Sequence, residues 1–410
     1  MAHNFVVGLD IGSYATKAVI GEVQRDGTLA LVGAITMPSS GLRKGVVADI
    51  TETAQSLSPV LAEIKKISKH AAGNIFLGVG SSDVRVQSSI GVVAVSRADS
   101  EIYQDDVNRA IASAQAVATP PNRMVLHYIV KEFIVDGVRD IRDPLEMVGN
   151  RLEVSTLIID SFAPAVKNIS KCVEMLGGGV GGLVLSPLAA ARAVLSKNQR
   201  ELGVVLVDVG AGKTTMCVYE ESKLLHTAIF PLGSSNITND LAIGVKIATE
   251  AAEQIKLGFG HAYTRDVSGR EMVELAKVSA KSRGMVAKKF VAEVIEGRLA
   301  EIFEFVDNEL KAIGKSGRLP AGVVLAGGGI RLPGVVDLAR QELKLAVQIA
   351  APDFAGITVR DESVARMAEQ PDFVCAVGLL LTGYDKARER TGVRVPLAGA
   401  LKQFLKYFAP

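Results

Sequence analysis

Cysteine and tryptophan are scarce in this chain of 410 residues, which contains three cysteines and no tryptophan. The cysteines, Cys172, Cys217 and Cys375, lie far apart, and no two of them form a CxxC pair. This spacing argues against a disulfide framework and against a thiolate metal site. We therefore expect a protein of a reducing compartment, with the cytoplasm as the default.

Long hydrophobic runs and a large excess of one charge are also absent. Even the apolar segment 182–195 contains Pro187 and Arg192, so no run of about 18 apolar residues is available to span a bilayer. The first residues lack the pattern of a signal peptide. Lys and Arg number 46 against 44 Asp and Glu, a net charge of +2, and we expect no nucleic-acid partner.

The residues that are present predict a large folded protein. Hydrophobic residues make up 48% of the chain and charged residues 22%, a balance typical of packed cores rather than of disorder. At roughly 150 residues per domain, the length predicts two or three domains.

One pattern of strands occurs twice. Apolar segments at 5–12, 15–23 and 30–36 predict a three-stranded meander, and the same pattern returns from residue 203. An offset of 198 residues aligns Asp10 with Asp208, Gly12 with Gly210 and Thr16 with Thr214. A period this long is unlike that of a solenoid and indicates a duplicated domain whose two halves face each other.

The segments between the repeats predict helices and one further module. Helical patterns cover 50–69, 249–258, 284–313 and 333–343. The first helix would be entered through Pro59, and the last follows a short strand at 323–326. Between residues 83 and 161, strand patterns surround a helix at 103–117, which predicts an inserted α+β module.

The end of the first strand carries residues suited to phosphate. Gly12 and Ser13 allow a tight turn whose N–H groups can bind phosphate oxygens, and Thr16 and Lys17 can add a hydroxyl and a charge. Asp10 would hold Mg²⁺ through water, because Mg²⁺ gives up its hydration shell reluctantly. Taken alone, the Asp-x-Gly pattern is more typical of an ordinary turn.

The repeat supplies a second turn of the same kind, with Asp208, Gly210, Gly212 and Thr214, so two turns and two aspartates can converge on one polyphosphate. A third, glycine-rich segment at 326–329 follows a strand and precedes a helix, as is needed where a backbone approaches a ligand closely. On its own, that segment is equally consistent with a flexible loop.

Together, the three segments resemble the phosphate and adenosine motifs of the superfamily of actin, sugar kinases and heat-shock chaperones. The resemblance implies an α/β, actin-like fold, in which two ribonuclease-H-like halves surround a nucleotide cleft that holds ATP or ADP with Mg²⁺. Glu253 and Lys256 stand where relatives contact the ribose and base, although a Glu and Lys pair on a solvated helix face is the alternative.

Within the superfamily, the chain most resembles the bacterial cell division family FtsA, over essentially its whole length. The segments that carry the resemblance are SGLRKGVV at 40–47, GVVAVSR at 91–97, HYIVKEFIVDG at 127–137, DPLEM at 143–147 and RLE at 151–153. Most of them lie in the inserted module, which in this family is an SHS2-type subdomain and which a metabolic kinase would not carry.

The resemblance implies a division of the chain into subdomains. The first half would comprise 1–82, 162–200 and 366–385, with the SHS2-type subdomain inserted at 83–161. The second half would comprise 201–233 and 318–365, and a subdomain at 234–317 would bind the C-terminal peptide of the tubulin homologue FtsZ. A linker at 386–396 would lead to an amphipathic membrane-targeting helix at 397–410.

The resemblance also assigns roles to residues, none of them catalytic. Arg298 matches a family position at the groove for the FtsZ peptide, and Asp10 and Asp208 would hold Mg²⁺. The residues expected to bind ATP are Asp10, Gly12, Ser13, Tyr14, Lys17, Asp208, Gly210, Ala211, Gly212, Lys213, Thr214, Glu253, Lys256, Gly327, Gly328 and Gly329.

The C-terminal segment has the pattern of a basic amphipathic helix. Its apolar stripe consists of Leu397, Leu401, Phe404, Leu405 and Phe408. Lys402 and Lys406 lie on the other side of the helix. About 14 residues span roughly 20 Å, too short for a hydrocarbon core of about 30 Å, so the helix would lie in the interface on anionic lipid. A helix docked on the protein's own core is the alternative.

The sequence departs from the family pattern near the phosphates. Ala211 and Lys213 replace a common third glycine and a threonine, and Thr215 stands where many superfamily members have an acidic residue. Loss of that carboxylate removes a group that could position metal or water, so we expect slow or negligible ATP hydrolysis. His127 and His226 have no catalytic partner at motif spacing, and we expect them to be structural.

The resemblance implies an ATP-binding cell division protein that polymerises on the inner face of the cytoplasmic membrane, at the division site. It would anchor the FtsZ filaments of the Z ring and recruit later division proteins. One alternative is a pilus assembly protein similar to PilM, which shares the fold and the inserted subdomain but lacks the amphipathic tail. Another is a small-molecule kinase, which would need a catalytic acid or base that no motif here supplies.

Overall fold

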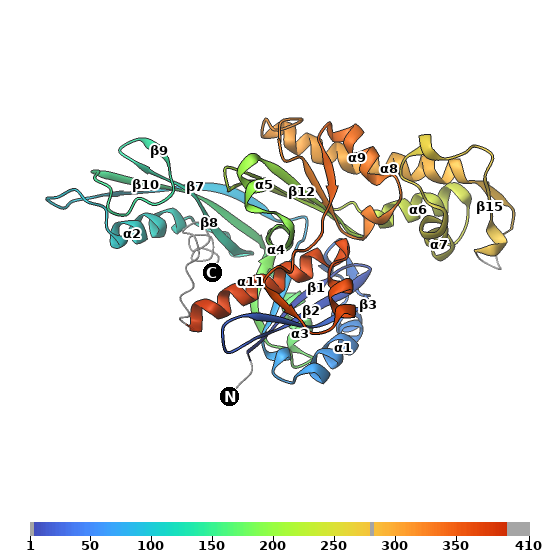
Figure 1. The fold of residues 1–410 in the computed structure, drawn as a ribbon, viewed down its shortest axis with the longest axis horizontal. Helices are drawn as coiled ribbons and strands as arrows, with labels where there is room; N and C mark the ends of the chain where they lie inside the picture. The colour runs from blue at the N-terminus through green and yellow to red at the C-terminus, as the bar shows by residue number, and fades with distance from the viewer. Residues whose placement is uncertain (1–3, 279–282, 392–410) are drawn as a thin grey trace.

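The computed structural model describes residues 4–278 and 283–391. Two sheets form the centre of the molecule, and five strands follow the same order in both, with β19 added at one edge of the first (Figure 1). The first sheet has the order β11-β6-β1-β2-β3-β19, with β1 (Asn4–Ile11), β2 (Ala15–Val23), β3 (Leu29–Pro38), β6 (Ile75–Val79), β11 (Val180–Leu185) and β19 (Ile357–Val359). The second has the order β14-β13-β12-β17-β18, with β12 (Val204–Val209), β13 (Thr214–Glu220), β14 (Lys223–Phe230), β17 (Val323–Ala326) and β18 (Val347–Ile349). In both, an antiparallel meander continues into two parallel strands, which confirms the duplication.

The first hairpins of the two meanders, β1–β2 and β12–β13, share their register. Asp10 lies opposite Lys17 in the first hairpin, and Asp208 lies opposite Thr215 in the second. The same hydrogen bond closes each turn, from Gly12 N–H to Ala15 O at 3.2 Å and from Gly210 N–H to Lys213 O at 2.9 Å. The offset of 198 residues therefore holds through both hairpins.

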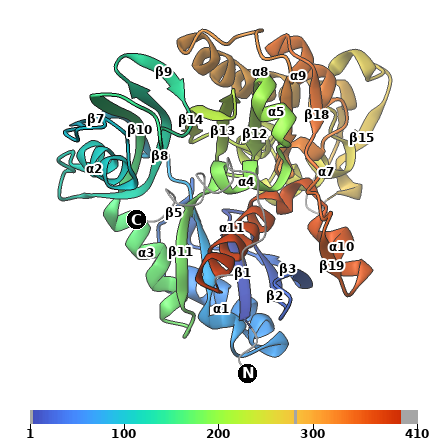
Figure 2. The same cartoon turned by 60° about the vertical axis from the view of Figure 1, so that its left-hand side comes forward.

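Helices cover both faces of the first sheet. α1 (Ile50–Ile67) and α3 (Ala163–Glu174) pack on one face, and α4 (Ser186–Val194) and α11 (Val374–Thr391) on the other. Alternate residues of β1 divide between these faces, as expected for a central strand: Val7 and Leu9 pack with α1, and Val6 packs with α11. Figure 2 shows α4 and α11 between the two sheets, where they share a core with β12 and β13.

The second sheet packs against α6 (Ser234–Val245), α7 (Thr249–Phe259), α8 (Lys288–Ala312) and α9 (Val335–Leu343). α7, α8, α9 and the strand β17 confirm the elements expected in this part of the chain, whereas α6 was not predicted. The short helix α5 (Lys197–Leu202) connects α4 to β12, α10 (Glu362–Ala368) follows β19, and β4 (Leu42–Arg43) pairs with β5 (Val46–Val47).

One helix begins at the predicted residue but not through its proline, and another begins later than predicted. The carboxylate of Asp49 accepts the Glu52 N–H at 2.9 Å, so α1 begins at Ile50 with an N-cap, and Pro59 lies within the helix rather than at its entrance. The long helix expected from residue 284 begins at Lys288, because Met285–Ala287 form β16, which pairs with β15 (Met272–Glu274).

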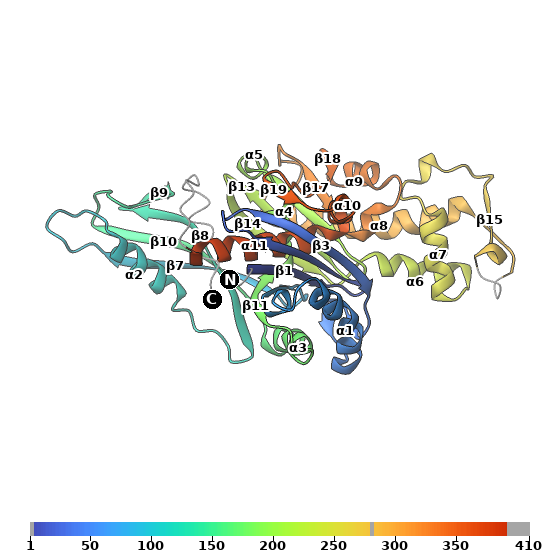
Figure 3. The same ribbon diagram turned by 60° about the horizontal axis from the view of Figure 1, so that its bottom comes forward.

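The inserted module is a four-stranded sheet with one helix. Its strands are β7 (Arg85–Ala94), β8 (Arg123–Val135), β9 (Val138–Ile141) and β10 (Arg151–Phe162), in the order β7-β10-β8-β9, and α2 (Gln104–Gln115) covers one face. Val107, Phe133 and Leu152 contribute to its core. The module and the helices α6 and α7 lie at opposite ends of the molecule, with the two halves between them (Figures 1 and 3).

The polar stretch at 386–396 is helical in its first part, so the expectation of a linker was wrong for 386–391. α11 continues to Thr391, and its last described turns are held by partners. The Asp385 carboxylate pairs with Arg192 Nε of α4 at 2.9 Å, and Lys386 Nζ lies 5.7 Å from the Phe76 ring centre. Across the described ranges, the structure has no helix that is both long and apolar enough to cross a membrane.

Candidate functional site

The turns of the two hairpins lie against each other. A Cβ at Gly212, in the second turn, would lie 2.8 Å from Ser13 Oγ in the first. Each turn stands at the end of the central strand of its sheet, β1 or β12, so each half of the molecule contributes one turn. The structure thus brings together the two turns that the repeat predicts to converge.

Asp10 and Asp208 lie within electrostatic reach of each other. The pKa of the half-buried Asp208 is raised to about 6, first because the surrounding chain removes water and second because Asp10 is near. Lys213 and Lys17 lower this pKa in part. Two carboxylates and two lysines around one place suit a divalent cation bound together with a polyphosphate.

The acidic groups alone do not make a complete metal site. In the part of the chain that the structure describes, no group of three or more His, Cys, Asp and Glu side chains could hold a metal ion. Asp10 and Asp208 would leave most positions around Mg²⁺ to water and phosphate. That is the coordination Mg²⁺ prefers at nucleotide sites, so the residues present fit the ion.

The glycine-rich segment 327–329 closes against the second turn. Gly327 has a φ of +91°, and a Cβ there would overlap Asp208 Oδ1 and the Val209 carbonyl oxygen. A Cβ at Gly329 would lie 2.6 Å from Val209 Cγ1 and 3.2 Å from the Ser234 side chain. Gly328 begins a 3-10 turn that follows β17. Only glycine fits the backbone and the space at Gly327, so this segment is built for close approach rather than for flexibility.

The N-terminus of α6 holds the second turn from behind. The Ser234 N–H donates to Gly210 O, and the Ser235 N–H donates to Ala211 O, both at 2.9 Å. The Thr214 hydroxyl, at the start of β13, donates to Leu232 O at 2.9 Å. Because the N–H of a trans peptide points away from its C=O, the N–H groups of Ala211 and Gly212 point away from α6.

Glu253 and Lys256 do not lie on a solvated helix face. Lys256 is 5% exposed, and its Nζ donates to Ser234 O at 3.2 Å and to Thr238 Oγ1 at 2.9 Å. Glu253 Oε2 lies 2.6 Å from Lys256 Nζ and accepts the Thr238 hydroxyl. The pair therefore fixes α7 to the first turn of α6, which in turn binds the second hairpin.

Two contacts near the turns were missed by the sequence analysis. Lys17 Nζ lies 3.3 Å from Asp372 Oδ2, and the buried Asp372 Oδ1 makes no hydrogen bond. Lys213 Nζ crosses between the halves and donates to Gly80 O at 2.6 Å. The pattern Gly78-Val79-Gly80 at the end of β6 is a signal that could have drawn attention to this edge, whereas no motif marks Asp372.

Thr215 and Tyr14 have contrasting environments. Thr215 is buried directly opposite Asp208 and so faces the same side of the sheet, and its hydroxyl makes no hydrogen bond. Tyr14 is 62% exposed at the first turn.

Comparison with known proteins gives consistent results over nearly the whole chain. The family model described as "Cell division protein FtsA" matches residues 205–378, and that described as "SHS2 domain inserted in FTSA" matches residues 81–160. The cell division protein FtsA of Bacillus subtilis is 37% identical, covering 95% of this chain and 86% of the relative, and that of Pseudomonas aeruginosa is 34% identical, covering 96% and 92%. The chain belongs to the FtsA family of cell division proteins.

Solved structures confirm the actin-like fold of this FtsA family member. A PilM–PilN type IV pilus biogenesis complex matches with a TM-score of 0.63 and 18% identity, covering 92% of this chain and 98% of the other. MreB5 of Spiroplasma citri bound to ADP matches with a TM-score of 0.52 and 11% identity, covering 95% and 97%. At these identities the likeness shows the fold alone.

Arg298, the predicted FtsA position for the FtsZ peptide, is occupied by intramolecular partners. Its Nε lies 2.7 Å from Asp240 Oδ2 and its Nη2 lies 3.0 Å from Asp240 Oδ1, while Nη1 pairs with Glu301. The hydrogen bond with Asp240 raises the pKa of Arg298. The guanidinium is thus held between α6 and α8, where an acidic ligand would compete with two carboxylates.

The two histidines have structural partners, as predicted. His127 is fully buried, and its Nε2 accepts the Leu185 N–H at 2.9 Å. Burial lowers the pKa of His127 to about 3, so it is neutral near pH 7. His226 Nε2 lies 2.8 Å from Glu309 Oε2 at the contact of β14 with α8.

The residues expected to bind the membrane fall outside the described part of the chain. These are Leu397, Leu401, Lys402, Phe404, Leu405, Lys406 and Phe408.

Proposed function

We propose that this FtsA family member binds ATP or ADP with Mg²⁺ between its two halves and polymerises on the inner face of the cytoplasmic membrane. There it anchors FtsZ filaments and recruits later division proteins. The observation that carries the nucleotide part is the meeting of two hairpin turns of identical register, each with an aspartate. The subdomain boundaries given in the sequence analysis are part of this proposal.

The nucleotide would bridge the two halves. The turns with Gly12, Ser13 and Tyr14 and with Gly210, Ala211, Gly212, Lys213 and Thr214 would hold the phosphates together with Lys17. Gly327 to Gly329 and the pair Glu253 and Lys256 would face the adenosine. Mg²⁺, held through water by Asp10 and Asp208, would neutralise phosphate charge.

The same site favours slow turnover. With Thr215 opposite Asp208, no carboxylate at that position can orient an attacking water. Nucleotide would then act as a ligand for conformation and assembly. Phosphate release at many turnovers per second by the purified chain would contradict this part of the proposal.

Attachment to FtsZ and to lipid would use two separate segments of the chain. The FtsZ peptide, which carries acidic residues, would displace the carboxylates that now hold Arg298, and the segment 397–410 would lie on anionic lipid. Two lysines contribute roughly 1 kcal/mol each at such a surface, so polymerisation would supply avidity.

Co-sedimentation with vesicles of phosphatidylglycerol and phosphatidylethanolamine tests the tether. We expect the full chain with ATP to carry an FtsZ C-terminal peptide into the pellet, a chain ending at residue 391 to leave both in solution, and Arg298→Ala to sediment without peptide. Binding of lipid that does not need residues 392–410, or of peptide that does not need Arg298, would contradict the proposal.

A further inference from the structure

The base of the inserted module is built into the first half. Arg123, at the start of β8, donates to Asp83 O at 2.7 Å and pairs with the buried Asp160. His127 of β8 accepts the Leu185 N–H of β11. Side chains from the base of β8 and β10, Leu126, Ile129, Leu157 and Ile159, lie in the same core as α4. The module should therefore move together with the first half.

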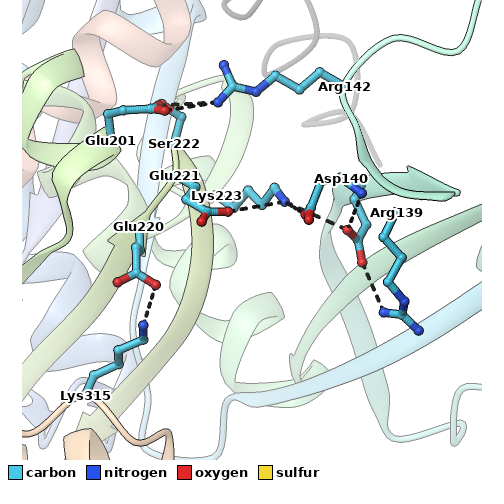
Figure 4. A network of polar contacts seen from close by, with 10 residues as sticks. Arg139, Asp140, Arg142, Glu201, Glu220, Glu221, Ser222, Lys223 and Lys315 are labelled. Atoms are coloured by element: carbon cyan, nitrogen blue, oxygen red, sulfur yellow. Dashed lines mark hydrogen bonds and ion pairs between the residues drawn. The ribbon is translucent and has the colours of Figure 1, made fainter. Parts of the chain in front are cut away.

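The edge of the module at β9 contacts the second half through charged groups (Figure 4). Lys223, which begins β14, places its Nζ 2.5 Å from Asp140 Oδ1 of β9 and 3.8 Å from Glu132 Oε2 of β8. Arg142 Nη2, just after β9, lies 3.1 Å from Glu201 Oε1 at the end of α5. Two ion-paired contacts thus join the module to the other half.

Glu201 links three parts of the molecule. It lies on α5, which connects α4 of the first half to β12 of the second. Its Oε2 accepts the Ser222 hydroxyl at 2.6 Å, and its backbone O accepts the Glu221 N–H at 3.0 Å, so the β13–β14 turn is fixed to α5. Arg142 adds the inserted module to the same carboxylate.

The ion-paired side chains between the module and the second half differ in solvent exposure. Lys223 and Glu132 are 15% and 14% exposed, whereas Arg142 and Glu201 are 59% and 50% exposed. Lys223 is also within 3.8 Å of Glu221 Oε2, so it lies among three carboxylates, of which Glu132 also pairs with Arg139 Nη1 at 3.5 Å. Removal of Lys223 would increase the repulsion among these carboxylates, and the exposed pair Arg142–Glu201 should weaken with salt.

The geometry points to a brace between the halves, made by the ion pairs Lys223–Asp140 and Arg142–Glu201 outside the cleft. The module is fixed to the first half. A contact from β9 to the second half therefore opposes a rotation of the halves that would open the cleft. Breaking the brace would then ease opening and speed the release of a bound nucleotide. This last consequence rests on the proposed function, whereas the brace itself does not.

Distances between spin labels test the brace directly. Introduced cysteines at Ser113 on α2 and Asn308 on α8, both exposed, report the module against the second half, and Ser113 with Gln55 on α1 reports it against the first. The three native cysteines are buried, and burial raises the pKa of Cys217 and Cys375, so the labels should react with the introduced thiols.

The charge variants are Arg142→Glu, Glu201→Arg, the double exchange, and Lys223→Met. Arg366→Glu, which reverses the charge in an exposed pair within α10, is the matched control. We expect the 113–308 distance to lengthen and broaden in both single reversals and in Lys223→Met, to recover in the double exchange, and to stay unchanged in the control. The 55–113 distance should stay the same in all. An unchanged 113–308 distance in the reversals, or no recovery in the double exchange, would overturn the brace.

Release of a fluorescent ATP analogue from the same variants tests the consequence. We expect release to be several-fold faster in the single reversals and to return to the parent rate in the double exchange. If the distances respond but the release rate does not, the coupling to the cleft is wrong. If the parent binds no nucleotide, the proposed function fails while the distances still decide the brace.

Discussion

At the residue scale, the candidate site depends on positions with no room for a side chain. Gly327 combines a positive φ with close packing on Asp208, whereas Gly317 has a φ of +64° and open space around it. We expect Gly327→Ala to lower the free energy of unfolding by about 3 kcal/mol and Gly317→Ala by about 1 kcal/mol, because only the first adds a clash to the backbone strain. Urea unfolding measures the loss of free energy of unfolding in each variant. Equal losses in the two variants would contradict the close packing of Gly327 on Asp208.

Asp208 should make stability depend on pH. Its folded-state pKa of about 6 lies above the ordinary 3.8, so between these values the folded chain binds more protons than the unfolded chain. Stability from this group is present below about pH 4 and is lost as the pH rises to about 6.

We therefore expect Asp208→Asn to gain about 2 kcal/mol more over the parent at pH 7.5 than at pH 4. Urea unfolding of the variant and the parent at both pH values gives the two differences. A gain that is the same at both pH values would show that burial does not penalise the charged carboxylate.

Most of the candidate site could be predicted from the sequence because the two hairpins repeat the same residues. Asp10 and Asp208, with their glycines, stand out only when the two hairpins are aligned, and the structure keeps that alignment through both turns. Asp372 could not be found in this way, because it approaches Lys17 from a connection near the end of the chain that has no counterpart in the other half. The contact of Lys213 with Gly80 joins segments 133 residues apart and leaves no periodic pattern.

At the element scale, two helices of the first half, α4 and α11, cross closely at a glycine. A Cβ at Gly378 of α11 would overlap the Ala189 carbonyl oxygen of α4, whereas Gly297 of α8 has nothing within 4 Å. We expect Gly378→Ala to destabilise the chain by about 3 kcal/mol, and Gly297→Ala to stabilise it by about 0.5 to 1 kcal/mol because alanine favours helix. Thermal unfolding of the two variants should shift in opposite directions, and a gain in Gly378→Ala would refute the close crossing.

Most strands and helices follow from local patterns, and the exceptions have physical reasons. Alternating and helical periodicity gave β2 and β17 with their bounds and α7 and α9 within two residues at each end. Pro59 was misread because it lies on the exposed face of α1, where a helix with a good N-cap can accept it. The polar residues 386–391 were read as a linker because a contact such as that of Lys386 with the Phe76 ring of β6 is tertiary.

At the scale of the whole molecule, one ligand between the halves should stabilise both. The halves share the core around α4 and α11, so unfolding of the parent should be one transition. At a hundred times its dissociation constant, MgATP should add about 2.7 kcal/mol. Calorimetry should show the single transition move upward as a unit, and a ligand that splits it into two would place the nucleotide on one half only.

One nucleotide with Mg²⁺ should bridge the two turns. Titration calorimetry of ATP, with and without Mg²⁺, into the parent, Asp10→Asn, Asp208→Asn and the double variant tests this bridging. We expect Mg²⁺ to tighten ATP binding to the parent about tenfold or more, each single variant to lose most of this gain, and the double variant to lose all of it. An undiminished Mg²⁺ effect in either single variant would contradict the bridging.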